Sequence, residues 1–79
     1  MSLQDRLIGL IAETLKVAPD RITPQSSADE IEAWDSLAHL NLMMTLEQSF
    51  GIRLDVNQMQ KLTSVEAILQ YLSEQGGQA

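Results

Sequence analysis

Residues 34–51 read WDSLAHLNLMMTLEQSFG, and this stretch decides the fold of the chain. It is rich in Leu, Met, Ala, Glu and Gln, which are among the residues that favour the α-helix most strongly. Asp35 can cap a helix that begins at Ser36, and Gly51 is the type of residue that commonly follows a helix end. The stretch therefore predicts a helix over residues 36–50.

The predicted helix has two apolar faces. At about 100° per residue, one face collects the residues expected to contact the core, which are His39, Leu42, Met43, Leu46 and Phe50. The other face is a stripe made of Leu37, Leu40 and Met44. Leu40 suits either packing beneath a loop or exposure, since bundle helices are often apolar over a wide arc. Leu37 and Met44 are expected to face partner proteins, because methionine adapts to surfaces of different shape.

A first helix is predicted upstream, over about residues 3–16, from apolar residues at helical spacing. Ser2 with Asp5 resembles a capping box at its start, and Pro19 forbids a simple continuation beyond its end. The connection over residues 17–34 has no sustained period and is predicted to be an ordered loop. Its apolar residues are expected to anchor it on the core, and they are Ile22, Ile31 and Trp34.

Two more helices are predicted downstream, a short one over about residues 56–61 and a longer one over about residues 64–75. Asp55 can cap the short helix. Thr63 with Glu66 resembles a capping box for the last helix, and the glycines at 76–77 are expected to stop it. No segment has the period of a strand. The predicted fold class is all-α, with three longer helices and one short helix.

Composition narrows the classes of function. A chain of 79 residues, 44% of them hydrophobic, is expected to form a single domain over residues 1–79, too small to enclose a large active site. The net charge of -6 repels nucleic acid and anionic lipid and favours encounters with basic protein surfaces. There is no cysteine, no long apolar run and no export signal at the N-terminus. We therefore expect a cytoplasmic protein without membrane insertion.

Ser36 is the candidate for a covalent modification. The start of a helix offers backbone N–H groups and the positive end of the helix dipole, both of which suit a phosphodiester. Its hydroxyl is expected to project into solvent. A serine at a helix start is also an ordinary capping or first-turn residue, so position alone leaves both roles open.

The run from Trp34 to Leu40 resembles the attachment motif of the acyl carrier protein family. Further downstream positions fit the same pattern, namely Leu42, Leu46, Glu47, Phe50 and Ile52. The resemblance covers nearly the whole chain and implies the four-helix bundle of that family. In such proteins the serine of the motif carries 4′-phosphopantetheine, which a dedicated transferase attaches from coenzyme A with magnesium. The resemblance implies that Ser36 is modified and that acyl groups are bound to the phosphopantetheine arm as thioesters. It also implies that the chain is a phosphoprotein carrier and not an enzyme.

The same resemblance implies a surface for partner enzymes. In the family, the Asp and Leu of the motif and further apolar and acidic residues of this helix contact partners, and here these are Asp35, Leu37, Met44 and Glu47. Leu40 joins them because it lies on the same apolar stripe. The expected partners are a phosphopantetheinyl transferase, an acyl- or aminoacyl-loading ligase, and a downstream synthase or transferase.

Three positions depart from the pattern of fatty-acid-type carriers. Ala38 and Asn41 stand where those carriers usually have acidic residues, and Trp34 stands where they usually have a small one. These differences indicate a specialised stand-alone carrier. The cargo stays open between fatty acyl, polyketide-like and aminoacyl groups.

Two alternatives to a carrier are considered. An unmodified helical adaptor would bind one partner through the stripe that contains Leu37. A hydrolase with Ser36 as nucleophile would need a positioned base and an oxyanion site. The only histidine, His39, is expected to be packed on its helix, and no residue is singled out as catalytic or as a metal ligand. Trp34 is expected to anchor the loop, with contact to the attached arm as the alternative.

Overall fold

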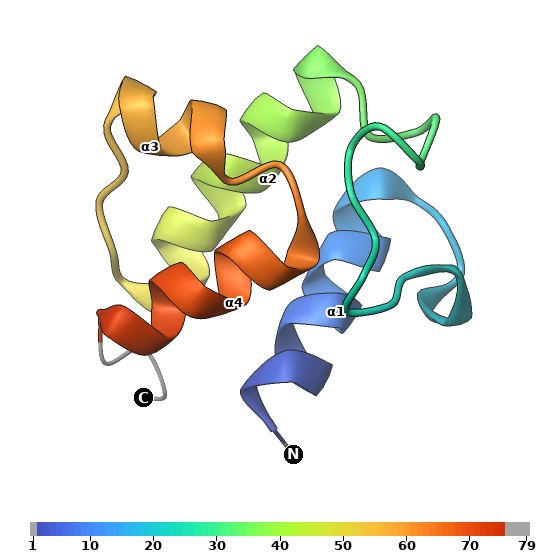
Figure 1. Ribbon diagram of the computed structural model, residues 1–79, viewed down its shortest axis with the longest axis horizontal. Helices are drawn as coiled ribbons and strands as arrows, with labels where there is room; N and C mark the ends of the chain where they lie inside the picture. The colour runs from blue at the N-terminus through green and yellow to red at the C-terminus, as the bar shows by residue number, and fades with distance from the viewer. Residues whose placement is uncertain (1, 76–79) are drawn as a thin grey trace.

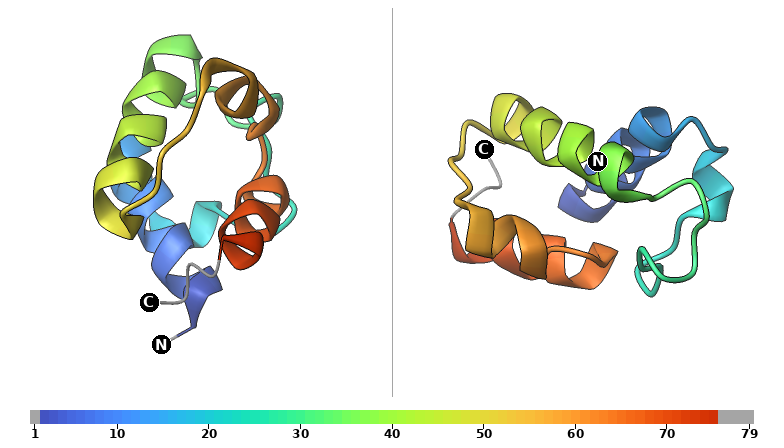
Figure 2. Two further views of the ribbon diagram at one scale, coloured as in Figure 1. Left: turned by 90° about the vertical axis from the view of Figure 1, so that its left-hand side faces the viewer. Right: turned by 90° about the horizontal axis from the view of Figure 1, so that it is seen from above.

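Four α-helices make up most of the computed structural model, which describes residues 2–75. They are α1 (Leu3–Leu15), α2 (Ser36–Phe50), α3 (Val56–Lys61) and α4 (Val65–Glu74), as labelled in Figure 1. The views of Figure 2 show α1 and α2 in one layer and α3 and α4 in the other. The predicted all-α class with three longer helices and one short helix is confirmed. No helix among the described residues is long and apolar enough to cross a membrane.

Side-chain caps define the starts of the helices. The Oδ1 atom of Asp35 accepts the N–H of Ala38 at 2.9 Å, so α2 begins at Ser36. Asp55 and Gln58 cap α3 reciprocally, each side chain accepting the backbone N–H of the other residue. Because a capping side chain satisfies an N–H group that has no partner within the helix, each start is fixed by a local contact.

The ends of α1 and α4 differ slightly from expectation. α1 ends at Leu15, because Lys16 adopts the left-handed conformation with φ of 61° and donates its N–H to Ala12 and Glu13 as a C-cap. α4 ends at Glu74, one residue earlier than expected. The glycines at 76–77, which we expected to stop the last helix, lie outside the described residues.

The N-cap of α4 is Ser64 and not the predicted Thr63. The Ser64 Oγ accepts the N–H of Ala67 at 3.1 Å. Thr63 instead belongs to the connection before α4, where its carbonyl accepts the N–H of Ala28 at 2.8 Å. The sequence offered two adjacent hydroxyl residues, and this pairing with a distant segment decides which of them caps the helix.

The long connection between α1 and α2 is held by a pair of hydrogen bonds to the start of α4. In addition to the bond between Ala28 and Thr63, the N–H of Val65 donates to the carbonyl of Ser26 at 3.0 Å. These bonds flank an isolated antiparallel bridge. Two of the expected apolar anchors, Ile22 and Trp34, are buried, and Ile31 is half-buried. The connection also contains a short 3-10 helix, η1 (Pro19–Arg21), which the sequence analysis did not predict.

The core joins α1, α2 and α4. Its fully buried side chains are Leu7, Ile11, Leu42, Met43, Leu46, Val65, Ile68 and Leu72. The predicted core face of α2 is confirmed for its three buried members, while His39 and Phe50 are half-buried. α3 buries no residue of its own, and the buried Leu54 and Leu62 lie just outside its two ends. Within α3, the half-buried Met59 packs against the core.

Leu46→Ala is expected to lower the free energy of unfolding by about 2–5 kcal/mol, because it removes a fully buried side chain and leaves a cavity. Urea denaturation followed by circular dichroism measures the change. The matched control is Leu37→Ala, the same substitution on the same helix at a side chain that is 70% exposed. We expect the control to stay within about 0.5 kcal/mol of the unsubstituted protein. Equal losses in both variants would contradict this assignment of the core face.

Candidate functional site

Ser36 occupies the first position of α2, and its side chain is exposed. The preceding Asp35 is in an extended conformation, with φ of −89° and ψ of −174°, so the chain turns sharply into the helix at this point. Asp35 uses its carboxylate to cap Ala38 and its carbonyl to accept the N–H of His39 at 2.8 Å. The Ser36 hydroxyl therefore lies in solvent at the positive end of a 15-residue helix.

Three of the residues expected to contact partners are apolar and exposed on α2. Leu37 is 70% exposed, Leu40 50% and Met44 47%. Spacings of three and four residues place them on one side of the helix. Leu40 does not pack beneath the long connection, which was one of the two possibilities left open by the sequence. Val56, at the start of α3, is also exposed at 67%, and the sequence analysis did not single it out.

Glu47 differs from the other residues expected to contact partners. Its side chain is half-buried, and its Oε2 atom accepts the backbone N–H of Leu54 at 2.8 Å. This bond ties the second half of α2 to the segment that leads into α3. The structure therefore gives Glu47 an internal anchoring contact that the sequence did not indicate.

His39 links three segments of the chain. The indole N–H of Trp34 donates to Nδ1 of His39 at 3.0 Å, and Nε2 of His39 lies 2.6 Å from the carbonyl oxygen of Met59. Since Nδ1 accepts and a carbonyl can only accept, this pattern assigns the proton of the neutral ring to Nε2. The expected packing of His39 and the anchoring role of Trp34, which is 3% exposed, are both confirmed.

These contacts also bear on the hydrolase alternative. A serine nucleophile needs a base within hydrogen-bond reach. Both ring nitrogens of His39 are already engaged, one with Trp34 and one with Met59. His39 is therefore occupied as a structural link and does not serve Ser36 as a base. Among residues 2–75, no group of three His, Asp or Glu side chains is arranged to hold a metal ion.

A small pocket of about 170 Å³ lies directly beside Ser36. Its lining comes from the long connection, the start of α2 and the segment before α4, and consists of Ala28, Trp34, Asp35, Ser36, His39 and Thr63. Neither Ala28 nor Thr63 was expected at the site from the sequence. No local signal could have done so, because the two residues meet only through the hydrogen bond between their backbones.

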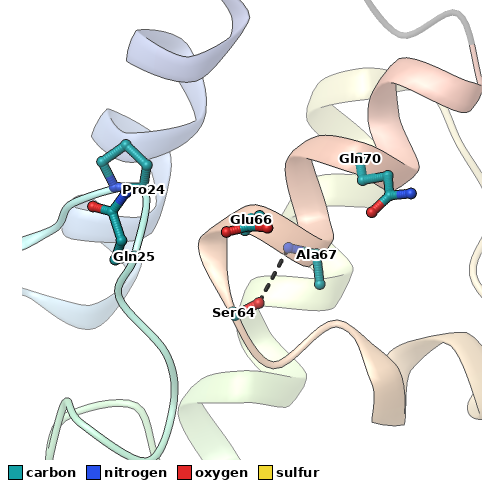
Figure 3. Close-up of a pocket in the computed structure, with 6 residues that line it drawn as sticks. All are labelled: Pro24, Gln25, Ser64, Glu66, Ala67 and Gln70. Atoms are coloured by element: carbon teal, nitrogen blue, oxygen red, sulfur yellow. Dashed lines mark hydrogen bonds between the residues drawn. The ribbon is translucent and has the colours of Figure 1, made fainter.

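A larger pocket, of about 340 Å³, lies away from Ser36. Figure 3 shows it between the long connection and α4, and it is lined by Pro24, Gln25, Ser64, Glu66, Ala67 and Gln70. Most of these side chains are polar, and none of the residues expected to contact partners belongs to it. The candidate site is therefore the surface around Ser36 with its smaller pocket, and not this larger pocket.

The residues around Ser36 fit a phosphodiester-linked arm. The hydroxyl is accessible, the helix N-terminus favours the negative charge of a phosphate, and the adjacent pocket can take an uncharged group close to the point of attachment. An arm held by one covalent bond also needs no enclosed cavity. This arrangement supports the attachment of an arm and the presentation of the group bound to it. It does not support a chemical reaction of that group.

Comparisons with known proteins agree with this arrangement. A family model described as "Phosphopantetheine attachment site" matches residues 5–72. The acyl carrier protein of Chlamydia muridarum is 34% identical over 74 residues, covering 94% of this chain and 96% of that protein. The acyl carrier protein of Thermosynechococcus vestitus is 30% identical over 70 residues, covering 87% of this chain and 85% of that protein.

A solved structure is also similar to this chain. It is the solution NMR structure of holo acyl carrier protein from Geobacter metallireducens, which matches with a TM-score of 0.80 and 30% sequence identity. The match covers 94% of this chain and 85% of that chain. Since the family model and these relatives all span most of the sequence, the chain belongs to the acyl carrier protein family, whose members carry a phosphopantetheine group and are not catalysts.

Proposed function

We propose that Ser36 carries the 4′-phosphopantetheine arm and that residues 1–79 act as one carrier domain. Acyl or aminoacyl groups bound to the arm as thioesters would be presented to partner enzymes in the cytoplasm. The observation that carries the proposal is an exposed serine at the start of α2, directly after its Asp35 cap, within a chain matched by the attachment-site family. The absence of cysteine supports it, because the thiol must then come from the arm.

The proposed attachment is a phosphoryl transfer from coenzyme A. The Oγ atom of Ser36 forms a bond to phosphorus, the bond from that phosphorus to the nucleotide part of coenzyme A breaks, and the hydroxyl proton passes to a base of the transferase. Ser36 needs no base of its own for this reaction. Its exposure supports the proposal, because the transferase has to reach the hydroxyl from outside.

We propose further that partner enzymes dock on the exposed side of α2, through Asp35, Leu37, Leu40 and Met44. These partners include the transferase, an acyl- or aminoacyl-loading ligase, and a downstream synthase or transferase. The net charge of -6 supports brief, salt-sensitive encounters with basic surfaces. Glu47 belongs to the same expected set of contact residues, but its carboxylate already accepts the backbone N–H of Leu54.

The class of carrier is part of the proposal. Ala38 and Asn41 lie on α2 near the docking surface and carry no charge, so this surface is less acidic than that of the fatty-acid-type carriers. This supports a specialised carrier. The alternative function is an unmodified adaptor that uses the same apolar stripe, which is favoured by the exposure of Leu37 at 70%.

Ser36→Ala is expected to abolish modification. Apo protein is incubated with coenzyme A, magnesium and a broad-specificity phosphopantetheinyl transferase, and its intact mass is measured. We expect the unsubstituted protein to gain the mass of one phosphopantetheine and the variant to gain none. Ser73→Ala, which removes a hydroxyl from an exposed position of α4, serves as the matched control and is expected to be modified fully.

Two results would contradict the proposal. Modification of the Ser36→Ala variant would place the arm on another residue. No gain of mass in the folded, unmodified protein with several transferases would favour the adaptor, whose binding to its partner should survive Ser36→Ala.

Leu37→Ala and Met44→Ala are each expected to slow modification by the transferase. Truncating an apolar anchor at the centre of an interface costs about 1–2 kcal/mol, so kcat/KM should fall by about tenfold. The rate is measured by the gain of mass over time, and the thermal midpoint should stay unchanged because both side chains are exposed. Gln70→Ala on α4 is the control and should keep the full rate. An unchanged rate in both α2 variants would remove this face from the docking surface.

Substitutions of Asp35 separate its role as a cap from its charge. Asp35→Ala is expected to lower the free energy of unfolding by about 1 kcal/mol, whereas Asp35→Asn should keep the stability because asparagine caps equally well. If partners recognise the charge, both variants should be modified more slowly and show a weaker salt dependence. Chemical denaturation and initial rates at two salt concentrations measure the two effects. If Asp35→Asn is modified at the same rate as the unsubstituted protein and with the same salt dependence, the charge is not recognised.

A further inference from the structure

The pocket beside Ser36 has walls that are fixed by hydrogen bonds within the protein. Trp34 donates its indole N–H to His39, and His39 is held in turn by the carbonyl of Met59. On the opposite rim, the N–H of Ala28 donates to the carbonyl of Thr63 at 2.8 Å. A pocket whose walls are already ordered loses little conformational freedom when a ligand enters it.

The chemistry of the pocket is mostly apolar. The ring nitrogens of Trp34 and His39 are engaged with other partners, and Ala28 and Thr63 each carry a methyl group on the rim. The volume of about 170 Å³ is too small for a long acyl chain but sufficient for a small branched apolar group. Ser36 itself belongs to the lining, so the pocket can be reached by whatever is attached to its hydroxyl.

We propose that this pocket binds the dimethyl-bearing carbon of the phosphopantetheine arm attached to Ser36. The inference rests on the proposed function. After its phosphate, the arm continues through one methylene to a quaternary carbon with two methyl groups, and the hydroxyl and amides that follow are polar. The only branched apolar part of the arm therefore lies next to the attachment point. Because the arm is tethered to a residue of the pocket, its effective concentration there is high, and a small apolar contact is enough to hold it.

The proposed contact leaves the apolar part of the docking surface free and shares only Asp35 with that surface. The pocket is lined by residues before α2, at its start and before α4, and it does not include Leu37, Leu40 or Met44. A partner can therefore contact the exposed side of α2 while the first part of the arm stays in the pocket. The distal part of the arm, which carries the thiol, remains available to the partner.

The test uses holo protein whose intact mass confirms one attached arm. The protein is labelled with ¹³C and ¹⁵N and the arm is not, so that filtered NMR experiments detect contacts between the two. We expect nuclear Overhauser effects from the two methyl groups of the arm to the ring of Trp34 and to the methyl groups of Ala28 and Thr63. Trp34 is the only tryptophan, so its indole signals are assigned without ambiguity. We also expect the methyl signals of the arm to shift from their positions in free coenzyme A, because of the ring current of the indole.

Thr63→Leu fills the pocket from its exposed rim, and Gln60→Leu places the same side chain on the exposed surface of α3 as a control. In Thr63→Leu we expect the contacts to Trp34 to disappear and the methyl signals to return to their positions in coenzyme A. The indole N–H signal of the apo variant should stay in place, which shows that the bond to His39 is intact. The control should retain every contact.

The outcomes separate this inference from the proposed function. Holo protein of the correct mass with no contact from the arm to Trp34, Ala28 or Thr63 overturns the pocket assignment and leaves Ser36 as the attachment site. Contacts that persist unchanged in Thr63→Leu also overturn it. A failure to gain the mass of the arm overturns the attachment to Ser36 itself.

Discussion

The hydrogen bonds from Trp34 to His39 and from His39 to Met59 link three segments of the chain through a side chain on the first turn of α2, the helix that begins at Ser36. Trp34 ends the long connection, His39 lies on the first turns of α2, and Met59 belongs to α3. If the ring of His39 were absent, the indole N–H of a buried tryptophan would lose its partner, which costs about 1–3 kcal/mol. The same loss would remove one of the contacts between α2 and α3, so His39 contributes both to the geometry of the site and to the position of α3.

This dependence follows from how little α3 contributes to the core. The other three helices bury apolar side chains, whereas α3 has no fully buried residue and packs only the half-buried Met59 against the core, so polar contacts add to its attachment. Besides His39, these contacts come from Tyr71 on α4, whose hydroxyl lies 3.2 Å from Oε1 of Gln58 and 3.3 Å from the carbonyl of Arg53. A small domain has little apolar area to bury. Hydrogen bonds made by side chains therefore hold α3 in place, where a larger protein would use apolar packing.

The sequence predicted the main helices, which depend on neighbouring residues, and missed the short helix η1 and several features that depend on distant residues. The helix over residues 36–50 follows from a cap, a helical period and a glycine, all within one stretch. The N-cap of α4 was predicted to be Thr63, but Ser64 caps the helix. The hydrogen bond between Thr63 and Ala28, which lies in a distant segment, could not be seen in the local sequence. In the candidate site, the resemblance of the motif singled out Ser36 and the helical spacing indicated the apolar stripe, although periodicity could not decide whether Leu40 is covered or exposed. The pocket and the bridge through His39 join several segments, so no local pattern indicates them.

α2 has one apolar face that packs on the core and a second apolar face that is exposed. One apolar face is enough to hold a helix on a core, and Leu42, Met43 and Leu46 supply it. The second face exposes several large apolar side chains to water, which contributes nothing to the core and favours association. A contiguous exposed apolar face of this kind is typical of a surface that contacts other proteins. The net negative charge opposes contacts between copies of the chain, so α2 can be apolar on two sides without promoting self-association.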